Sequence, residues 1–140
     1  MQATQIFEPF FAMILLTFTV WIVMYVRRIR YSIANRIHAQ SLGTPEKVVK
    51  VLPEEVQYPA YNLSNLLELP IIFYALCLYL FVSGNVDTLY VIAAWSYVGL
   101  RAVHSVIQCT TNIVMRRFAV YMASSVVLWL MVLRAALGAF

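Results

Sequence analysis

Long apolar stretches without charged residues make up most of the chain, and short polar segments separate them. The charge-free stretches span residues 9–26, 69–83, 88–100 and 118–133. A helix needs about 20 residues to cross the hydrocarbon core of a bilayer. The second and third stretches reach that length only if they also take in polar residues at their inner ends. The pattern predicts an all-α integral membrane protein, a bundle of four transmembrane helices.

The composition agrees with lipid as the solvent of this chain. Its 140 residues are 63% hydrophobic and 11% charged, whereas a soluble domain carries about 25% charged residues. A small β-barrel is the alternative, but the stretches are continuously apolar and show no period-two alternation. We expect one membrane domain over residues 1–140. Its spans are expected near 7–38 (with a cytoplasmic extension), 60–83, 87–110 and 116–138.

Basic residues indicate on which side of the membrane each linker lies. They gather in the linkers after the first and the third span, whereas the turn at 83–87 carries none. The positive-inside rule places those two linkers in the cytoplasm and both termini on the non-cytoplasmic side. The short linkers favour a multi-pass protein of a bacterial inner membrane. Because Met1–Phe7 lacks a basic segment and no cleavage site follows the first span, we expect that span to be retained.

Net charge and cysteines exclude several other classes of site. The net charge of +4 lies mostly in the cytoplasmic linkers, which favours attraction to anionic lipid over nucleic-acid binding. Cys77 and Cys109 lack CxxC spacing. We expect them to be small packing residues, with neither a disulfide nor a metal site.

Prolines indicate where the helices are interrupted. The segment 43–59 contains one glycine and three prolines, and it is predicted to be a cytoplasmic loop with a short turn near 46–51. The second span should begin just after Pro59. Pro70 lies inside that span, so a kink is expected near Leu66.

Ionisable and amide side chains within the spans gather at one end of the bundle. Such groups are costly in lipid and indicate paired, hydrated or functional positions. Counted from the turn at 83–87, Glu68 and Arg101 reach matched depths, and Asn65 and His104 lie one turn further in. Two polar stripes are therefore expected to face each other across the second and third spans. Their members are Tyr61, Asn65, Glu68, Arg101, His104 and Gln108.

Two interpretations of Glu68 and Arg101 stay open. They form either an ion pair that only joins two helices or part of a binding site. Arg27 and Arg117 lie at the cytoplasmic ends of the first and fourth spans, and Tyr121 follows four residues after Arg117. Position alone makes these three residues anchors at the lipid headgroups.

The polar motifs resemble those of the membrane-associated proteins in eicosanoid and glutathione metabolism, the MAPEG superfamily. The densest motif is Asn65-x-x-Glu68-x-Pro70 in the second span, and Arg101-x-x-His104 follows in the third. The resemblance covers nearly the whole chain, including the basic first linker and the short second one.

The end of the first span and the start of the fourth extend this resemblance. Val26-Arg27 is similar to the end of helix one in the family. Arg117 and Tyr121 have a spacing similar to the branch of microsomal prostaglandin E synthase and microsomal glutathione transferase. Together with the short linkers, the resemblance indicates a bacterial-type member of the superfamily.

What the resemblance implies is a homotrimer with glutathione as co-substrate in cytoplasm-facing clefts between subunits. Arg117 and Tyr121 would be catalytic, with Arg117 stabilising the thiolate. The residues implied to bind glutathione are Arg27, Asn65, Glu68, Arg101 and His104. A lipophilic electrophile or lipid peroxide would enter from the membrane as the second substrate of a transferase or peroxidase.

Several positions depart from the pattern of the animal enzymes. Tyr61 and Ser64 stand where arginines of helix two clamp glutathione, and Gln108 stands where that branch has a tyrosine. Phe118 replaces a residue with a hydroxyl group after the catalytic arginine. The proline is also two residues closer to Glu68 than in those enzymes.

Two alternative functions follow from these residues. The departures favour a non-catalytic protein of the same fold that binds a lipid or a partner, with a degenerate thiol site. An ion or proton pathway through Glu68, Arg101 and His104 is less favoured, because such a relay needs a wet route to both sides. The outer halves of the spans are almost wholly apolar.

Overall fold

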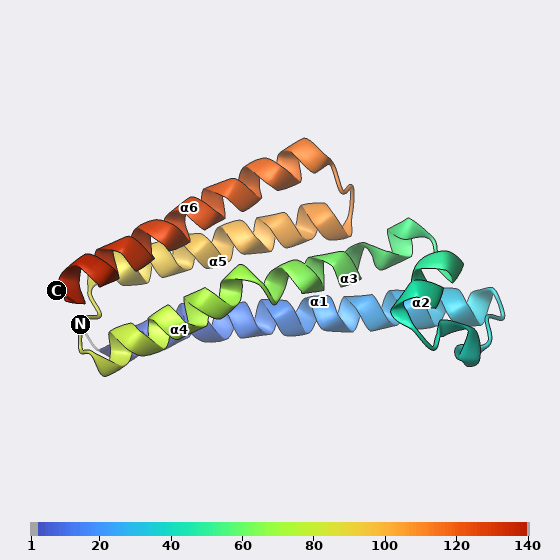
Figure 1. Ribbon diagram of the computed structural model, residues 1–140, viewed down its shortest axis with the longest axis horizontal. Helices are drawn as coiled ribbons and strands as arrows, with labels where there is room; N and C mark the ends of the chain where they lie inside the picture. Colours follow the sequence, from blue (N-terminus) through green and yellow to red (C-terminus); the bar gives the residue numbers. More distant parts are fainter. Residues whose placement is uncertain (1–2, 140) are drawn as a thin grey trace.

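The computed structural model describes residues 3–139, and every regular element in that range is helical. The elements are η1 (Ala3–Ile6), α1 (Phe7–Ala34), η2 (Ala39–Leu42), α2 (Pro45–Val51), α3 (Glu54–Leu66), α4 (Leu69–Val82), α5 (Thr88–Cys109) and α6 (Val114–Ala139). Four stretches are long and apolar enough to cross a membrane, with η1 continuing into α1 and α3 into α4. They form an elongated bundle in which α1 begins and α6 ends at the same end (Figure 1). The predicted all-α membrane bundle is confirmed.

The first helix stops sooner than expected. α1 ends at Ala34, whereas the sequence pattern extends the helix to His38. Arg36 adopts a φ of 52°, and the N–H of Ile37 donates to the carbonyl of Ser32 at 2.9 Å. This left-handed turn satisfies the last carbonyls of the helix and reverses the chain.

The linker after α1 is more helical than its prolines suggest. The expected short turn is present as α2, but α3 begins at Glu54, before Pro59 rather than after it. Pro59 lacks an N–H and leaves the carbonyl of Glu55 without its helical donor. Glu55 is exposed, so water can satisfy that carbonyl. The expected start of the second span is therefore corrected to an earlier residue.

A break divides the second span at the position that its proline indicates. α3 ends at Leu66 and α4 begins at Leu69, with Pro70 in the first turn of α4. Glu68 between them has φ −97° and ψ −100°, outside the helical region. Since Pro70 can donate no hydrogen bond to the carbonyl of Leu66, the helix cannot pass through this point. The predicted kink is confirmed.

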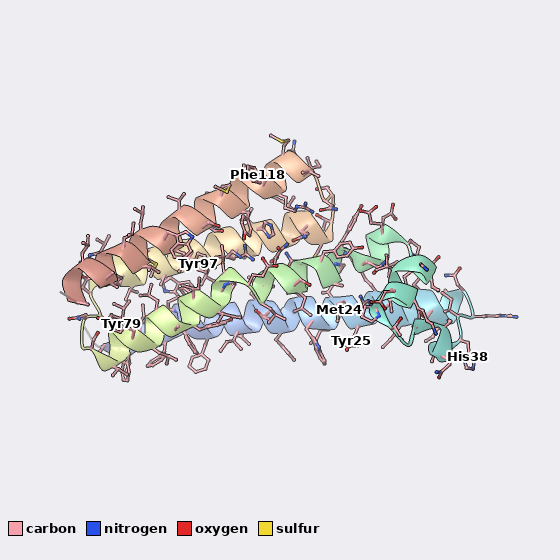
Figure 2. The ribbon with its side chains drawn as sticks, in the orientation of Figure 1. Met24, Tyr25, His38, Tyr79, Tyr97 and Phe118 are labelled. Carbon is pink, nitrogen blue, oxygen red and sulfur yellow. The ribbon has the colours of Figure 1, made fainter. Side chains whose placement is uncertain are left out.

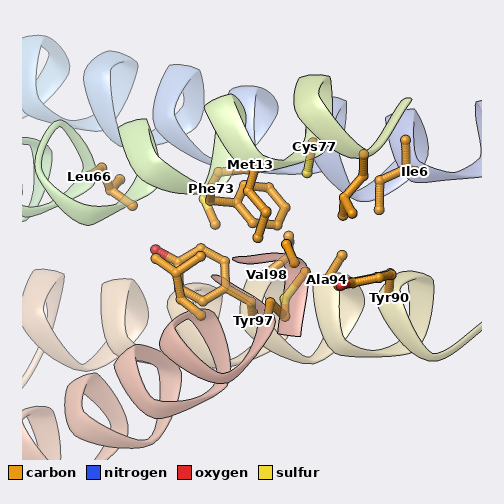
Figure 3. Packing of buried hydrophobic residues seen from close by; sticks show 14 of the residues in the cluster. Ile6, Met13, Leu66, Phe73, Cys77, Tyr90, Ala94, Tyr97 and Val98 are labelled. Carbon is orange, nitrogen blue, oxygen red and sulfur yellow. The ribbon is translucent and has the colours of Figure 1, made fainter. Parts of the chain in front are cut away.

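A layer of apolar side chains holds together the half of the bundle in which α1 begins and α6 ends. Met13 of α1, Phe73 of α4 and Tyr97 of α5 are all buried, and the rings of Phe73 and Tyr97 lie 4.9 Å apart. Figure 3 shows these residues meeting between α4 and α5. Large apolar residues such as Leu15 and Leu130 remain exposed on the outside of the single chain. Apolar side chains on both faces are typical of helices in a bilayer.

An exposed ion pair joins the turn before α5 to the end of α6. Arg134 donates two hydrogen bonds to Asp87, one of them 3.0 Å from Nη1 to Oδ1. Its guanidinium also lies over the ring of Tyr90, 4.2 Å from the centroid. Asp87 in turn accepts the N–H of Tyr90 and so caps the N-terminus of α5. These hydrogen bonds from Arg134 and the backbone lower the pKa of Asp87 to about 2.

Asp87→Asn should produce a small loss of stability near neutral pH that disappears in acid. The pKa of Asp87 rises from about 2 in the folded protein to its ordinary 3.8 on unfolding. The carboxylate therefore stabilises the fold above about pH 4, and this contribution is lost as pH falls through about 2. Thermal unfolding of both proteins in detergent across this range would measure the difference. The effect should be modest because the pair is exposed, and equal differences at both ends of the pH range would contradict this role.

Candidate functional site

Buried polar side chains join α3 to α5 in the half of the bundle away from the start of α1. Asn62 on α3 is fully buried, and its amide nitrogen lies 2.9 Å from Oε1 of Gln108 and 3.4 Å from Nδ1 of His104. The amide nitrogen of Asn65 donates to the same Gln108 oxygen at 3.0 Å. Because an amide nitrogen can only donate, this second contact is a hydrogen bond in the histidine tautomer whose Nδ1 is unprotonated. This network fixes the orientation of His104.

Arg101 is the largest side chain buried in this cluster. It has no solvent exposure, and Nη2 donates to the backbone carbonyl of Asn65 at 2.9 Å. Its guanidinium carbon lies 5.2 Å from the centre of the Tyr121 ring, close enough for a cation–π interaction. Nε and Nη1 are buried without hydrogen-bond partners. Within residues 3–139 only Arg134 and Asp87 form an ion pair, so Glu68, the carboxylate that acts electrostatically on Arg101, does so from beyond ion-pair distance.

The break in the second span explains why Arg101 bonds a backbone group. In a continuous helix the carbonyl of Asn65 would accept from the N–H of Leu69. Here the nearest backbone donor is the N–H of Glu68, at a long 3.5 Å. The carbonyl is therefore available to the guanidinium, which satisfies it.

The expectation that two polar stripes face each other holds for Asn65, which contacts α5, but not for Tyr61 or for an ion pair of Glu68. The sequence pattern pairs Glu68 with Arg101, but the Glu68 side chain is exposed and forms no ion pair within the described chain. The residues of α3 that face α5 are Asn62 and Asn65, whereas Tyr61 points outward and is exposed. The break at Glu68 ends the regular spacing on which the predicted stripe depends. The interpretation as an ion pair within one chain is thus corrected.

A pocket of about 250 Å³ opens beside this cluster between α3, α5 and the start of α6. The lining residues are Asn65, His104, Val114, Met115, Arg117, Phe118 and Tyr121. The rings of His104 and Tyr121 lie 5.6 Å apart. The pocket therefore combines an imidazole, a phenol and a guanidinium with apolar walls.

The turn before α6 holds the arginine of this pocket. Nη1 of Arg117 donates to Oδ1 of Asn112 at 2.6 Å. Asn112 has a φ of 48°, a left-handed conformation that asparagine adopts more readily than most residues. Its N–H donates to the carbonyl of Ile107 at 2.7 Å, which anchors the turn to the end of α5.

Most of the residues expected at the site come together, but two do not. Asn65, His104, Arg117 and Tyr121 line the pocket, and Arg101 lies directly behind it. Arg27 near the end of α1 and the exposed Glu68 are not among its lining residues. In one chain the two residues stand apart from the expected glutathione site.

Sequence reasoning missed Asn62 and Asn112. Asn62 lies three residues before Asn65, so the helical i, i+3 spacing places both on one face and could have indicated it. The sequence Thr110-Thr111-Asn112 between two apolar helices is a turn signal, and asparagine is the residue most able to take a left-handed position there. Residue spacing alone does not show which arginine would donate to Asn112.

The structure thus defines a four-helix membrane protein with a partly buried cationic pocket at one end. The family model of the MAPEG family matches residues 6–137, and the chain belongs to this family. Its members are membrane glutathione transferases or related proteins. Neither the comparison with curated proteins nor the comparison with solved structures yields a match.

Proposed function

We propose that this protein is a membrane-bound transferase or peroxidase that uses glutathione, or another small thiol, against lipophilic electrophiles. The observation that carries the proposal is Arg101, a fully buried cation with two unpartnered donors and no carboxylate of the described chain within ion-pair distance. A buried charge without a partner is costly. Glutathione carries two carboxylates, so binding it beside Arg101 would supply the missing negative charge.

The roles of the pocket residues follow from their chemistry. Arg117 would stabilise the thiolate, since a nearby cation lowers the pKa of a thiol and raises its nucleophilic fraction. Tyr121, which faces both His104 and Arg101, would place its hydroxyl beside the sulfur. Asn65 and His104 would hold the polar parts of the thiol. In transfer, the sulfur forms a bond to the electrophilic carbon, the leaving group departs with its electron pair, and the thiol proton passes to water.

A homotrimer with its sites between subunits would account for the residues that one chain leaves outside the pocket. Glu68 is exposed on the single chain. In a bilayer its side chain would meet lipid, where an unpaired carboxylate is unfavourable. A neighbouring copy covering this face would shelter Glu68 and could bring Arg27 to the same site. By the positive-inside rule the pocket would lie on the cytoplasmic side and both termini on the opposite side of the membrane, which we infer to be a bacterial inner membrane.

A non-catalytic binding protein of the same fold is the second candidate function. One observation favours it. Ser64 stands where the animal enzymes have an arginine, and its hydroxyl donates to the carbonyl of Ala60 at 3.3 Å. Tyr61, at the other arginine position, is exposed on the single chain. Such a protein would hold a lipid or a partner where the transferase holds glutathione.

A calorimetric titration of the full-length protein in detergent with reduced glutathione separates the two functions. The transferase should bind glutathione at micromolar to millimolar concentrations, and Arg27→Ala and Arg117→Ala should each weaken binding about tenfold, the weight of one charged hydrogen bond. Arg30→Ala serves as the control, because Arg30 is exposed on the same helix as Arg27. No heat at about 10 mM glutathione, together with a co-purifying lipid that glutathione does not displace, would overturn the transferase in favour of the binding protein.

A further inference from the structure

A second cationic site lies at the far cytoplasmic end, away from the pocket of Arg117. A cavity of about 650 Å³ lies between the end of α1 and the linker that carries α2. Tyr25 and His38, which both line it, lie at the end of the bundle that holds α2, opposite Tyr79 (Figure 2). A neighbouring cavity of about 430 Å³ shares Arg28, Leu42 and Val48 with it. Arg28 thus stands between the two.

The end of α1 presents two parallel rows of side chains to the larger cavity. Arg28 and Ser32 are four residues apart and so lie on one helix face, and Arg36, in the left-handed turn after the helix, also lines the cavity. The second row is apolar, with two members on the helix and one beyond the turn. Its members are Ile29, Ile33 and Ile37. One wall of the cavity therefore offers hydrogen-bond donors with positive charge, and the adjoining wall offers hydrocarbon.

The polar row is not satisfied within the chain. Nε of Arg28 and Oγ of Ser32 are buried without a hydrogen-bond partner. None of the residues that line either cavity, all within the described range, is acidic, whereas Arg28, Arg36 and His38 are basic or imidazole groups. The cavity therefore complements an anion.

The depth and the apolar row indicate which anion. The charge-free part of α1 ends at Val26, so Arg28 and Ser32 lie at the level of the lipid headgroups. Ile29, next to Arg28, is nevertheless 54% exposed, which is unfavourable in water and suitable beside a glycerol backbone or acyl chain. A hydrophilic anion would leave this apolar row uncovered.

We propose that this cleft binds the headgroup of an anionic glycerophospholipid of the cytoplasmic leaflet. Its phosphate lies against Arg28, Ser32 and Arg36, and its glycerol backbone and the start of its acyl chains lie against Tyr25 and Ile29, on the membrane side of the cavity. Arg28 and Ser32 position the phosphodiester, and Leu42 and Val48 of the linker close the cleft from the other side. This site is separate from the proposed thiol chemistry and does not depend on it.

Native mass spectrometry of the full-length protein in detergent, titrated with short-chain phosphatidylglycerol, tests the proposal. We expect Arg28→Gln to weaken binding about fivefold more than Arg30→Gln, the weight of one cation near an anionic lipid. Arg30 is exposed on the same turn and lines neither cavity, so it reports general attraction to anionic lipid. Ser32→Ala changes no charge, and it should also weaken binding by at least about threefold, the weight of one hydrogen bond.

The remaining arms separate a lipid site from its alternatives. Phosphatidylcholine of the same chain length should bind less tightly than phosphatidylglycerol, and inorganic phosphate should not compete. Equal losses in Arg28→Gln and Arg30→Gln with unchanged binding in Ser32→Ala would overturn the site in favour of general electrostatics. If inorganic phosphate competes with phosphatidylglycerol, the ligand is a free phosphate and the assignment of a lipid is wrong. Should Arg28→Gln fail to fold, as judged by circular dichroism and gel filtration, the Ser32→Ala result decides by itself.

Discussion

Arg117→Ala should lower glutathione-dependent turnover by about 10²- to 10³-fold, the usual cost of removing a group that stabilises developing charge. The variant should also shift the pH–rate profile of kcat to higher pH. Without the guanidinium the pKa of the bound thiol rises toward its free value of about 8.5, so less thiolate is present near neutral pH. Steady-state conjugation of a lipophilic aryl halide, measured across pH, would show both effects.

Two matched variants distinguish the charge of Arg117 from the support of its turn. Arg116 is the exposed neighbour of Arg117, and Arg116→Ala should retain turnover. Asn112→Gly keeps the left-handed backbone accessible but removes the oxygen that accepts from Arg117 at 2.6 Å. We expect about a tenfold loss in kcat with little change in KM, because Arg117 remains charged but is less well positioned. Equal activity in Arg116→Ala and Arg117→Ala would contradict the catalytic role.

Arg101→Met should leave the stability of the ligand-free protein nearly unchanged while abolishing stabilisation by glutathione. Replacing Arg101 by an apolar side chain of similar volume removes the desolvation penalty of a buried charge, which is on the order of several kcal/mol. Losing the hydrogen bond to the carbonyl of Asn65 would cost about 1–3 kcal/mol, so the two effects offset each other. A binding role for Arg101 therefore predicts a variant that is folded but no longer responds to the thiol.

Thermal unfolding in detergent, with and without glutathione, measures both parts of this prediction. Arg101→Lys is the matched variant, since it keeps a positive charge but loses the planar donor set of the guanidinium. It should retain a reduced glutathione response. If Arg101→Met loses several degrees of stability yet keeps the full response, Arg101 is a structural residue and the proposed anion site is wrong.

The helices and the depth of the polar cluster could be predicted because they depend on local sequence. Hydropathy places four spans, and the missing N–H of Pro70 places the break before α4. The early start of α3 was not predicted, because Pro59 is tolerated only where water reaches the carbonyl of Glu55. That access depends on how the linker packs.

The partners within the cluster could not be predicted because they depend on helix rotation. A rotation of one residue position about α3 exchanges Tyr61 for Asn62 on the face that meets α5. Counting along two helices also assumes that both are regular, and the break at Glu68 violates that assumption. Hydropathy does not show whether a guanidinium will donate to a backbone carbonyl or to a carboxylate. The contact of Arg101 with the carbonyl of Asn65 was therefore not predicted.

The same contact has a consequence for anyone who maps this protein by mutagenesis. The acceptor for Arg101 is a main-chain oxygen, which every amino acid at position 65 would supply. Changing Asn65 would therefore remove its amide contact with Gln108 but would leave the carbonyl that binds Arg101. That carbonyl is available because Pro70, five residues downstream, breaks the helix. An alanine scan interpreted only through side-chain contacts would assign Pro70 a purely structural role. It would overlook the contribution of Pro70 to positioning Arg101.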